Sequence, residues 1–416
     1  MNEPAVATLP AALPPPALKP GRGLVFILGA LTVIGPFAID MYLPALPQIA
    51  RDMAVDVGTV QLTLSVFLLG IAVGQAFYGP IVDRWGRRLP LLVGLVVFVV
   101  ACVGCGLARS MTALLGWRLV MALGGAASMV VPRAVVRDYF NERDSARMYS
   151  LLMVILSVSP IFAPSVGGQL IGFTGWRGIF WVLAGLGVAC LAAVGWGLPE
   201  SEPVAGRPTG GLGLALRTYW RLLRDRRFLG ASLVLGLTVG AIFSYLTGSS
   251  FVLIELYGLT PQQYALAFGF NGAGLIVASQ LNRWLVGRYS VERVLAGALL
   301  GDVLVGLALA LVGATGWGGL TALMACLFLN LSVAAVITPN VAAIAMAPFG
   351  PVAGSASALL GTIQFGVAAT AGALVGIGHN GTAVPMTAGV ALCALGSWTV
   401  WHTLGRAARR PGPQHA

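Results

Sequence analysis

The first long apolar segment of the chain ends in Gly35-Pro36-Phe37-Ala38-Ile39-Asp40-Met41-Tyr42-Leu43-Pro44. This stretch places one ionisable side chain, Asp40, where a bilayer would surround it if the segment crosses a membrane. A charged, unpaired carboxyl group costs several kcal/mol in hydrocarbon, so an acid at such a position is a candidate functional residue. The remaining sequence must show whether the segment crosses a membrane.

Composition answers that question. The chain has 416 residues, of which 57% are hydrophobic and 9% charged, and its mean hydropathy is +0.88. These values are far from those of water-soluble domains and predict an integral membrane protein. The apolar runs are about 20 residues long, which suits a membrane-spanning helix and is twice the length of a barrel strand. We therefore expect an all-α membrane protein.

Twelve spans are predicted, and because the number is even, both termini should lie on one side of the membrane. The spans are 24–46, 59–79, 89–108, 112–134, 148–170, 176–198, 229–251, 264–286, 291–313, 317–340, 352–376 and 381–403.

The basic residues indicate which side that is. Most arginines between spans fall on the side of the termini, whereas Arg51, Arg109 and Arg177 fall on the other. The positive-inside rule then places both termini in the cytoplasm. The net charge of +11 is thus a topology signal, and no nucleic-acid partner is expected.

The polar intervals divide the chain into halves. We predict a disordered cytoplasmic tail, a six-helix bundle, a cytoplasmic linker, a second six-helix bundle and a second cytoplasmic tail. Their respective bounds are 1–22, 23–198, 199–228, 229–404 and 405–416. The linker contains an amphipathic basic segment at 216–224, which should lie on the anionic lipids of the inner leaflet.

The two halves also resemble each other weakly. Asp83-Arg84-Trp85-Gly86-Arg87 follows the second span, and Asn282-Arg283-Trp284-Leu285-Val286-Gly287-Arg288 follows the eighth. Transporters are commonly built from such repeats, with the binding site at their interface. A duplicated helical anchor without a cavity is the alternative, and it gives no reason for an acid inside the membrane.

Asp40 and Arg118 are the predicted proton-coupling residues. Each lies about six residues from the outer end of its span, so both are expected roughly 9 Å below the outer surface. Burial disfavours a charged carboxyl group and a nearby arginine favours it, so a change in their separation would load or release a proton. A static salt bridge is the alternative. Asp302 is a second acid inside a span, and the sequence supplies no partner for it.

No enzyme, metal or disulfide chemistry is expected. All five cysteines lie inside predicted spans, and the three histidines are scattered, so neither a disulfide framework nor a metal site is implied. No phosphate-binding glycine-rich loop with its lysine is present. A membrane enzyme remains the alternative from another class, but no catalytic cluster supports it.

Residues 79–88 read Gly-Pro-Ile-Val-Asp-Arg-Trp-Gly-Arg-Arg and resemble the motif between helices two and three of the major facilitator superfamily. The resemblance implies a latch at the cytoplasmic gate. In such a latch Asp83 would face the N-terminus of a helix from the other half, and the arginines would bridge neighbouring helix ends. The residues assigned to this gate are Gly79, Asp83, Arg84, Gly86, Arg87 and Arg88.

Span five reads Ala163-Pro164-Ser165-Val166-Gly167-Gly168, which is similar to the antiporter motif Gly-Pro-x-x-Gly-Gly of the same superfamily. Pro164, Gly167 and Gly168 would bend the helix, although a kink without directional meaning is the alternative. In span four the family's usual Gln and Gly after the arginine are replaced by Met121 and Ala122. The role of Arg118 carries over, but its usual hydrogen-bonding neighbour does not.

Segments 40–47, 137–140, 245–251 and 348–358 most resemble the bicyclomycin- and chloramphenicol-resistance subfamily of drug:proton antiporters. The resemblance implies export of amphipathic small-molecule drugs by alternating access between two six-helix bundles. Protons would drive the export, membrane lipids would surround a functional monomer, and no cofactor would be needed. By family analogy, the candidates for the substrate pocket are Phe37, Tyr42, Tyr245, Phe251, Asn271, Asn330 and Gln364. An uptake carrier of the same fold is the competing function.

Overall fold

A computed structural model describes residues 22–140, 142–198 and 212–405, and within these ranges the chain is helical without strands. The short segments η1 and η3 are 3₁₀ helices, and η2 and η4 are π-helical. The elements are α1 (Arg22–Asp40), η1 (Leu43–Ala45), α2 (Leu46–Met53), α3 (Val57–Trp85), α4 (Arg88–Leu107), α5 (Met111–Tyr139), α6 (Glu142–Gly197), α7 (Leu212–Arg224), α8 (Arg226–Ser250), η2 (Phe251–Leu256), α9 (Pro261–Val286), α10 (Val291–Thr315), α11 (Gly319–Met346), η3 (Ala347–Val352), α12 (Ala353–Ile377), α13 (Val384–Val400) and η4 (Trp401–Gly405).

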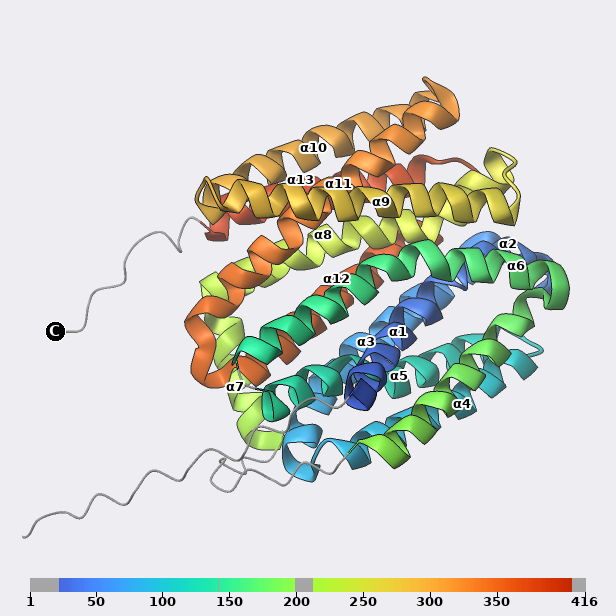
Figure 1. Cartoon of the computed structure of the whole chain (residues 1–416). Helices are drawn as coiled ribbons and strands as arrows, with labels where there is room; N and C mark the ends of the chain where they lie inside the picture. Colours follow the sequence, from blue (N-terminus) through green and yellow to red (C-terminus); the bar gives the residue numbers. More distant parts are fainter. Residues whose placement is uncertain (1–21, 141, 199–211, 406–416) are drawn as a thin grey trace, which may run out of the picture.

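Eleven segments of the described chain are long and apolar enough to cross a membrane. One of them, within α6, is 51 residues long and would extend about 75 Å if straight, more than twice the thickness of the hydrocarbon layer. The backbone leaves the helical conformation at Gly175, where φ is 66°, a value that glycine adopts without strain. Figure 1 shows α6 running to one end of the molecule and returning. Its two arms are the fifth and sixth spans, so the prediction of twelve crossings is confirmed.

The helices form two bundles that meet along two seams (Figure 1). The first bundle contains α1 to α6 and the second contains α8 to α13. Helix α3 packs against α12 along one seam, and α6 packs against α9 along the other. We call the end where the described chain starts and stops the tail end, and the opposite end the far end. The prediction of two six-helix bundles is confirmed.

The first span differs from its prediction of 24–46. Helix α1 ends at Asp40, and the chain continues through η1 and α2 to Met53. Pro44 and Pro47 are the second residues of η1 and α2. Since proline has no N–H, each favours the start of a new helix over the continuation of an old one. The predicted depth of Asp40 was therefore based on a wrong outer boundary. Asp40 lies at a helix end rather than within a helix.

Side chains in the loops fix where several spans begin. At the far end Asp56 caps α3 by accepting hydrogen bonds from the backbone N–H groups of Gly58 and Thr59. A hydrogen bond from the Thr59 hydroxyl is the main reason that the pKa of Asp56 is lowered. Thr260 and Gln263 form a reciprocal capping box at the start of α9. These caps set where α3 and α9 begin at the far end of the seams.

The predicted amphipathic linker segment is helical. It forms α7, whose neighbours are α8 and α12. Residues 199–211 of the predicted linker lie outside the described residues, as do the predicted tails apart from Arg22 and Gly405.

Candidate functional site

Asp40 is the last residue of α1, and its side chain is buried at 5% exposure. No hydrogen bond or ion pair joins its carboxyl group to any described residue. The neighbouring segment η1 contacts α8 and α9 of the second bundle. Across the boundary between the bundles, the charge of an ionised Asp40 would act on the hydroxyl groups of Tyr245 and Tyr264.

Arg118 is fully buried on α5 and binds the C-terminal end of α1, the helix that ends at Asp40. Its Nη1 donates a hydrogen bond of 2.9 Å to the carbonyl oxygen of Ala38. That oxygen is among the last four carbonyls of α1, which have no partner within the helix. A cation at this position is also favoured by the negative end of the helix dipole.

Two aromatic rings hold the Arg118 guanidinium in place. Its central carbon lies 4.4 Å from the ring centroid of Tyr42 and 4.3 Å from that of Phe67. The Met121 sulfur lies 3.9 Å from Nη1, so the residue that replaces the family's glutamine does contact the arginine. Arg118 and Asp40 form no ion pair in this structure. The expected direct contact is replaced by a contact with the backbone two residues before Asp40.

Helices α8 and α9, which η1 contacts, carry a set of side chains that we call the tyrosine cluster. It comprises Tyr245, Ser249, Tyr264, Phe268 and Asn271, from α8 and α9, and all five are buried. Asn271 Nδ2 donates to the Tyr245 hydroxyl at 3.1 Å, and the hydroxyls of Ser249 and Tyr264 are 2.8 Å apart. The Phe268 ring stacks on Tyr245. The cluster is therefore an apolar surface carrying a few hydroxyl and amide groups, as small-molecule sites usually are.

The structure brings together only some of the predicted pocket residues. Tyr245 and Asn271 belong to the tyrosine cluster, whereas Tyr42 lies inside the first bundle between Arg118 and Phe180. Phe251 packs edge-on against His379 at the far end. Phe37 and Gln364 are half-buried, on α1 and α12.

Three members of the cluster, Ser249, Tyr264 and Phe268, were not among the predicted site residues, and neither was Phe67 beside Arg118. Tyr264, Phe268 and Asn271 follow one another at helical spacing on one face of α9. Since Asn271 was a predicted pocket residue, this spacing could have indicated that the two aromatic residues belong to the same site. Ser249 and Phe67 carry no comparable signal, because serine and phenylalanine are common packing residues in membrane helices.

Asn330, also a predicted pocket residue, is instead the partner of Asp302. Its Nδ2 donates to Asp302 Oδ1 at 3.0 Å, between α11 and α10. Asp302 is 1% exposed, and its Oδ2 has no hydrogen-bond partner. This pair lies inside the second bundle, and neither residue belongs to the tyrosine cluster.

The glycines of the antiporter motif form close contacts with two different elements. A Cβ atom at Gly167 would overlap the carbonyl oxygen of Met41, the residue after Asp40. A Cβ atom at Gly168 would lie 3.0 Å from the carbonyl oxygen of Pro261, at the start of α9. Pro164 is buried, and α6 continues as a helix through it. The motif therefore holds α6 tightly against both the Asp40 segment and the second bundle.

The gate motif lies at the tail end, where α3 ends and α4 begins. Gly86 ends α3 with φ of 82°, a conformation that glycine favours. Arg87 Nε forms a buried ion pair of 2.7 Å with Asp138 Oδ2 on α5, and Arg88 donates to the Gly195 carbonyl of α6. Arg84 is exposed, and the Asp83 side chain lies outside the described part of the structure.

Both seams are closed at the far end. Arg51 Nη1 and Glu255 Oε1 form an ion pair of 3.6 Å between the bundles, and Gln262 Nε2 donates to the Gly168 carbonyl at 3.3 Å. On the other seam a Cβ atom at Gly376 would lie 3.0 Å from the Gly58 carbonyl oxygen, so the backbones of α3 and α12 are close. The structure therefore represents a conformation sealed at the far end.

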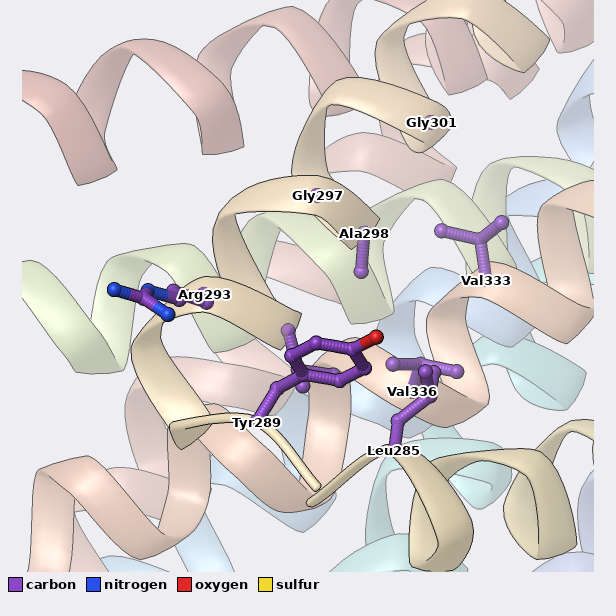
Figure 2. Close-up of a pocket in the computed structure, with 9 residues that line it drawn as sticks. Leu285, Tyr289, Arg293, Gly297, Ala298, Gly301, Val333 and Val336 are labelled. Carbon is purple, nitrogen blue, oxygen red and sulfur yellow. The ribbon is translucent and has the colours of Figure 1, made fainter. Parts of the chain in front are cut away.

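A cavity of about 400 Å³ lies elsewhere, near the tail end of α9, α10 and α11 (Figure 2). Its wall is mainly apolar and includes Leu285, Tyr289, Val333 and Val336, with Arg293 beside it. None of the predicted site residues lines it. The cavity is separated by its position from Asp40 and the tyrosine cluster. Among the described residues, no group of three His, Cys, Asp or Glu side chains could hold a metal ion.

The chain is similar to known membrane transporters. A family model described as Major Facilitator Superfamily matches residues 28–373. The uncharacterized MFS-type transporter YdgK of Bacillus subtilis is 35% identical over 378 residues, covering 90% of this chain and 93% of its own. The bicyclomycin resistance protein homolog of Haemophilus influenzae is 30% identical over 388 residues, covering 91% and 95%.

A solved structure supports the same architecture. The crystal structure of a D-xylose-proton symporter superposes with a TM-score of 0.71 at 14% sequence identity, covering 91% of this chain and 97% of the symporter. At this identity the similarity concerns the fold alone. The two bundles described above are thus the arrangement found in known membrane transporters.

Proposed function

The chain belongs to the major facilitator superfamily, and from that premise we propose that it exports amphipathic antibiotics across the bacterial inner membrane in exchange for protons. It is a membrane transporter and not an enzyme, since the family and the relatives are transporters. The resemblance to the bicyclomycin-resistance subfamily is confirmed. The direction of transport, the substrate and the mechanism are the substance of the proposal.

One observation carries the proposal. A buried acid without a partner, Asp40, ends a helix at the boundary between the bundles, and the segment that follows it contacts α8 and α9, which carry the tyrosine cluster. An ionised carboxyl group at such a position would be costly, whereas a protonated one is tolerated. Protonation of Asp40 is therefore coupled to the binding of substrate between the bundles.

Arg118 supplies the alternative partner for Asp40 once the proton has left. It binds the Ala38 carbonyl only two residues away, and its Nε and Nη2 atoms are buried without partners. Because α1 ends at Asp40, the backbone beyond that residue is not held in a continuous helix. A small rearrangement at this helix end would bring the carboxylate to the guanidinium, as an ion pair with charge-assisted hydrogen bonds.

The exchange cycle follows from these contacts. Substrate enters between the bundles and packs against the tyrosine cluster, and the Asp40 proton leaves as the carboxylate turns to Arg118. After the bundles rock and release the substrate, a proton from the opposite side restores neutral Asp40. One proton moving inward through 100 mV supplies about 2.3 kcal/mol before any pH gradient is added.

The tyrosine cluster favours an amphipathic substrate. Aromatic rings offer apolar contact, and the hydroxyls of Tyr245, Ser249 and Tyr264 with the Asn271 amide offer hydrogen bonds. No basic side chain belongs to the cluster, so a strongly anionic substrate would lack a counter-charge. Chloramphenicol-like and bicyclomycin-like molecules combine apolar surface with hydroxyl and amide groups and meet this requirement.

The distribution of arginines supports cytoplasmic termini, as the positive-inside rule requires. One chain supports the whole path, because both bundles and both seams are its own. We therefore propose a functional monomer that uses the proton gradient and no cofactor. Uptake of a small metabolite by the same fold is the competing function, and the direction of substrate movement distinguishes the two.

Flux in proteoliposomes tests the proposal. Radiolabelled chloramphenicol is trapped with the protein under an imposed pH gradient and voltage, and its movement is followed with and without an ionophore. We expect movement against the proton current in the wild type and none with Asp40→Asn. Asp56→Asn is the matched control, because asparagine also caps a helix and this site is exposed. Movement with the proton current would support uptake instead, and full activity of Asp40→Asn would contradict the coupling role.

A further inference from the structure

Helix α7, which the transport cycle does not use, has one face packed against the bundles. Ala215, Tyr219 and Leu222 are buried and follow one another at helical spacing. The helix contacts α8 and α12 of the second bundle at the tail end. Its position at the tail end is visible in Figure 1. Helix α7 is thus packed onto the second bundle.

Tyr219 extends from α7 to the first bundle. Its hydroxyl donates a hydrogen bond of 3.1 Å to the carbonyl oxygen of Ala76 on α3. In a regular helix that oxygen accepts from the N–H group four residues later, but residue 80 is a proline and has none. Tyr219 therefore satisfies the carbonyl that Pro80 leaves without its helical partner.

This hydrogen bond lies beside the gate motif. A Cβ atom at Gly79 would lie 3.4 Å from the Ala358 side chain of α12 and 3.8 Å from the Tyr219 hydroxyl. The bond thus joins α7 to α3 where the α3–α12 seam reaches the tail end. Prolines inside helices are common bending points, and a bend here would change how α3 meets α12.

The opposite side of α7 has no partner among the described residues. Leu216 and Trp220 are 56% and 58% exposed, one helical turn apart. Arg217, Arg221 and Arg224 flank them, form no ion pair with any described residue, and are exposed. The guanidinium of Arg224 lies over the Trp220 ring at 4.8 Å. A leucine and a tryptophan framed by arginines suit the boundary of an anionic lipid layer.

We propose that α7 docks on anionic phospholipid headgroups and, through Tyr219, controls the bend of α3 at Pro80. When the arginines bind the lipid surface, α7 holds the Tyr219 hydroxyl on the Ala76 carbonyl, and this favours the conformation sealed at the far end. Without anionic lipid, α7 is held less firmly and the bond is made less often. The inference concerns the lipid surface and holds whichever way the substrate moves.

The test measures the population of the sealed conformation in vesicles. The five native cysteines are replaced by alanine, and spin labels are attached at Arg109→Cys and Ala314→Cys, two exposed far-end positions in different bundles. Distances between the labels are compared in phosphatidylcholine vesicles with and without phosphatidylglycerol. We expect phosphatidylglycerol to increase the short-distance population, and the variant Arg217→Gln/Arg221→Gln/Arg224→Gln to lose this response.

The variant Arg283→Gln/Arg288→Gln/Arg293→Gln is the matched control, since it removes as much exposed charge at the same end. It should respond as the unmutated chain does. An equal response of the two triple variants would overturn the assignment of the lipid surface to α7, and would indicate general attraction of the tail end to the membrane.

A double-mutant experiment tests the hydrogen bond from Tyr219 to α3. In anionic vesicles Tyr219→Phe should lower the ratio of sealed to open populations about five-fold, the effect of one hydrogen bond. In a Pro80→Ala chain the same substitution should have no effect, because alanine restores the N–H partner of the Ala76 carbonyl. Tyr289→Phe, at an exposed tyrosine of the tail end, is the control. Equal effects of Tyr219→Phe with and without Pro80 would overturn the proposal.

Discussion

The two bundles share an architecture, and each buries one acid, but the two acids have different surroundings. Asp40 ends a helix, has no partner and faces the other bundle. Asp302 lies within α10, accepts a hydrogen bond from Asn330 and is enclosed by its own bundle. The two acids share burial, but they differ in their place in the fold. Asp40 lies at a break in its helix and at the boundary between the bundles, and this position is the basis for proposing it as the coupling residue.

Among the variants that test this difference between the two acids, removal of the Arg118 charge should have the largest effect on export. Arg118→Met keeps much of the side-chain volume but provides neither a donor for the Ala38 carbonyl nor a partner for ionised Asp40. We expect export in the flux assay to fall to background. Folding, followed by size-exclusion chromatography, should persist because Tyr42 and Phe67 still pack around the side chain. Export near the wild-type rate would show that Asp40 needs no cation.

Changing Asp302 should affect stability more than transport. Asp302→Asn retains an oxygen to accept from Asn330, so we expect export within about two-fold of wild type. Asp302→Ala leaves the buried Asn330 amide without an acceptor and should lower the free energy of unfolding by about 1–3 kcal/mol. Thermal unfolding of both variants in detergent measures this difference. Loss of export with Asp302→Asn at normal stability would give the second bundle a coupling acid as well.

The smallest effect is expected at the far end. The ion pair between Arg51 and Glu255 crosses the boundary of the bundles, but the Arg51 side chain is largely exposed to solvent. Exposed pairs contribute about 0–1 kcal/mol, so Glu255→Gln should shift the balance of conformations by less than about five-fold. The distance between far-end spin labels reports this shift. A larger change would mean that this pair, rather than helix packing, holds the far end closed.

Sequence reasoning succeeded where one rule applied to a whole segment. The length of the apolar runs predicted twelve crossings, including the two arms of α6 on either side of Gly175. Asp40 drew attention because an acid in an apolar span is conspicuous, and the structure shows that its side chain is buried; its coupling role stays a prediction. The amphipathic pattern of 216–224 predicted a helix, which the structure shows as α7.

Sequence reasoning failed where the answer depended on how helices are rotated against one another. Depth along a span suggested that Arg118 contacts Asp40, but the arginine binds the Ala38 carbonyl, which became available because α1 ends at Asp40. Pro44 and Pro47 could have indicated that end. Asn330 was placed in the pocket and is instead the partner of Asp302, since nothing in the sequence states which helix faces are adjacent.

Proton release on substrate binding is the most direct test of the role of Asp40. Chloramphenicol is added to purified protein in weakly buffered detergent solution, and a pH-sensitive dye reports the protons released. We expect release from the wild type and from Asp302→Asn, and none from Asp40→Asn. Equal release from Asp40→Asn and the wild type would contradict the claim that this acid exchanges its proton for the substrate.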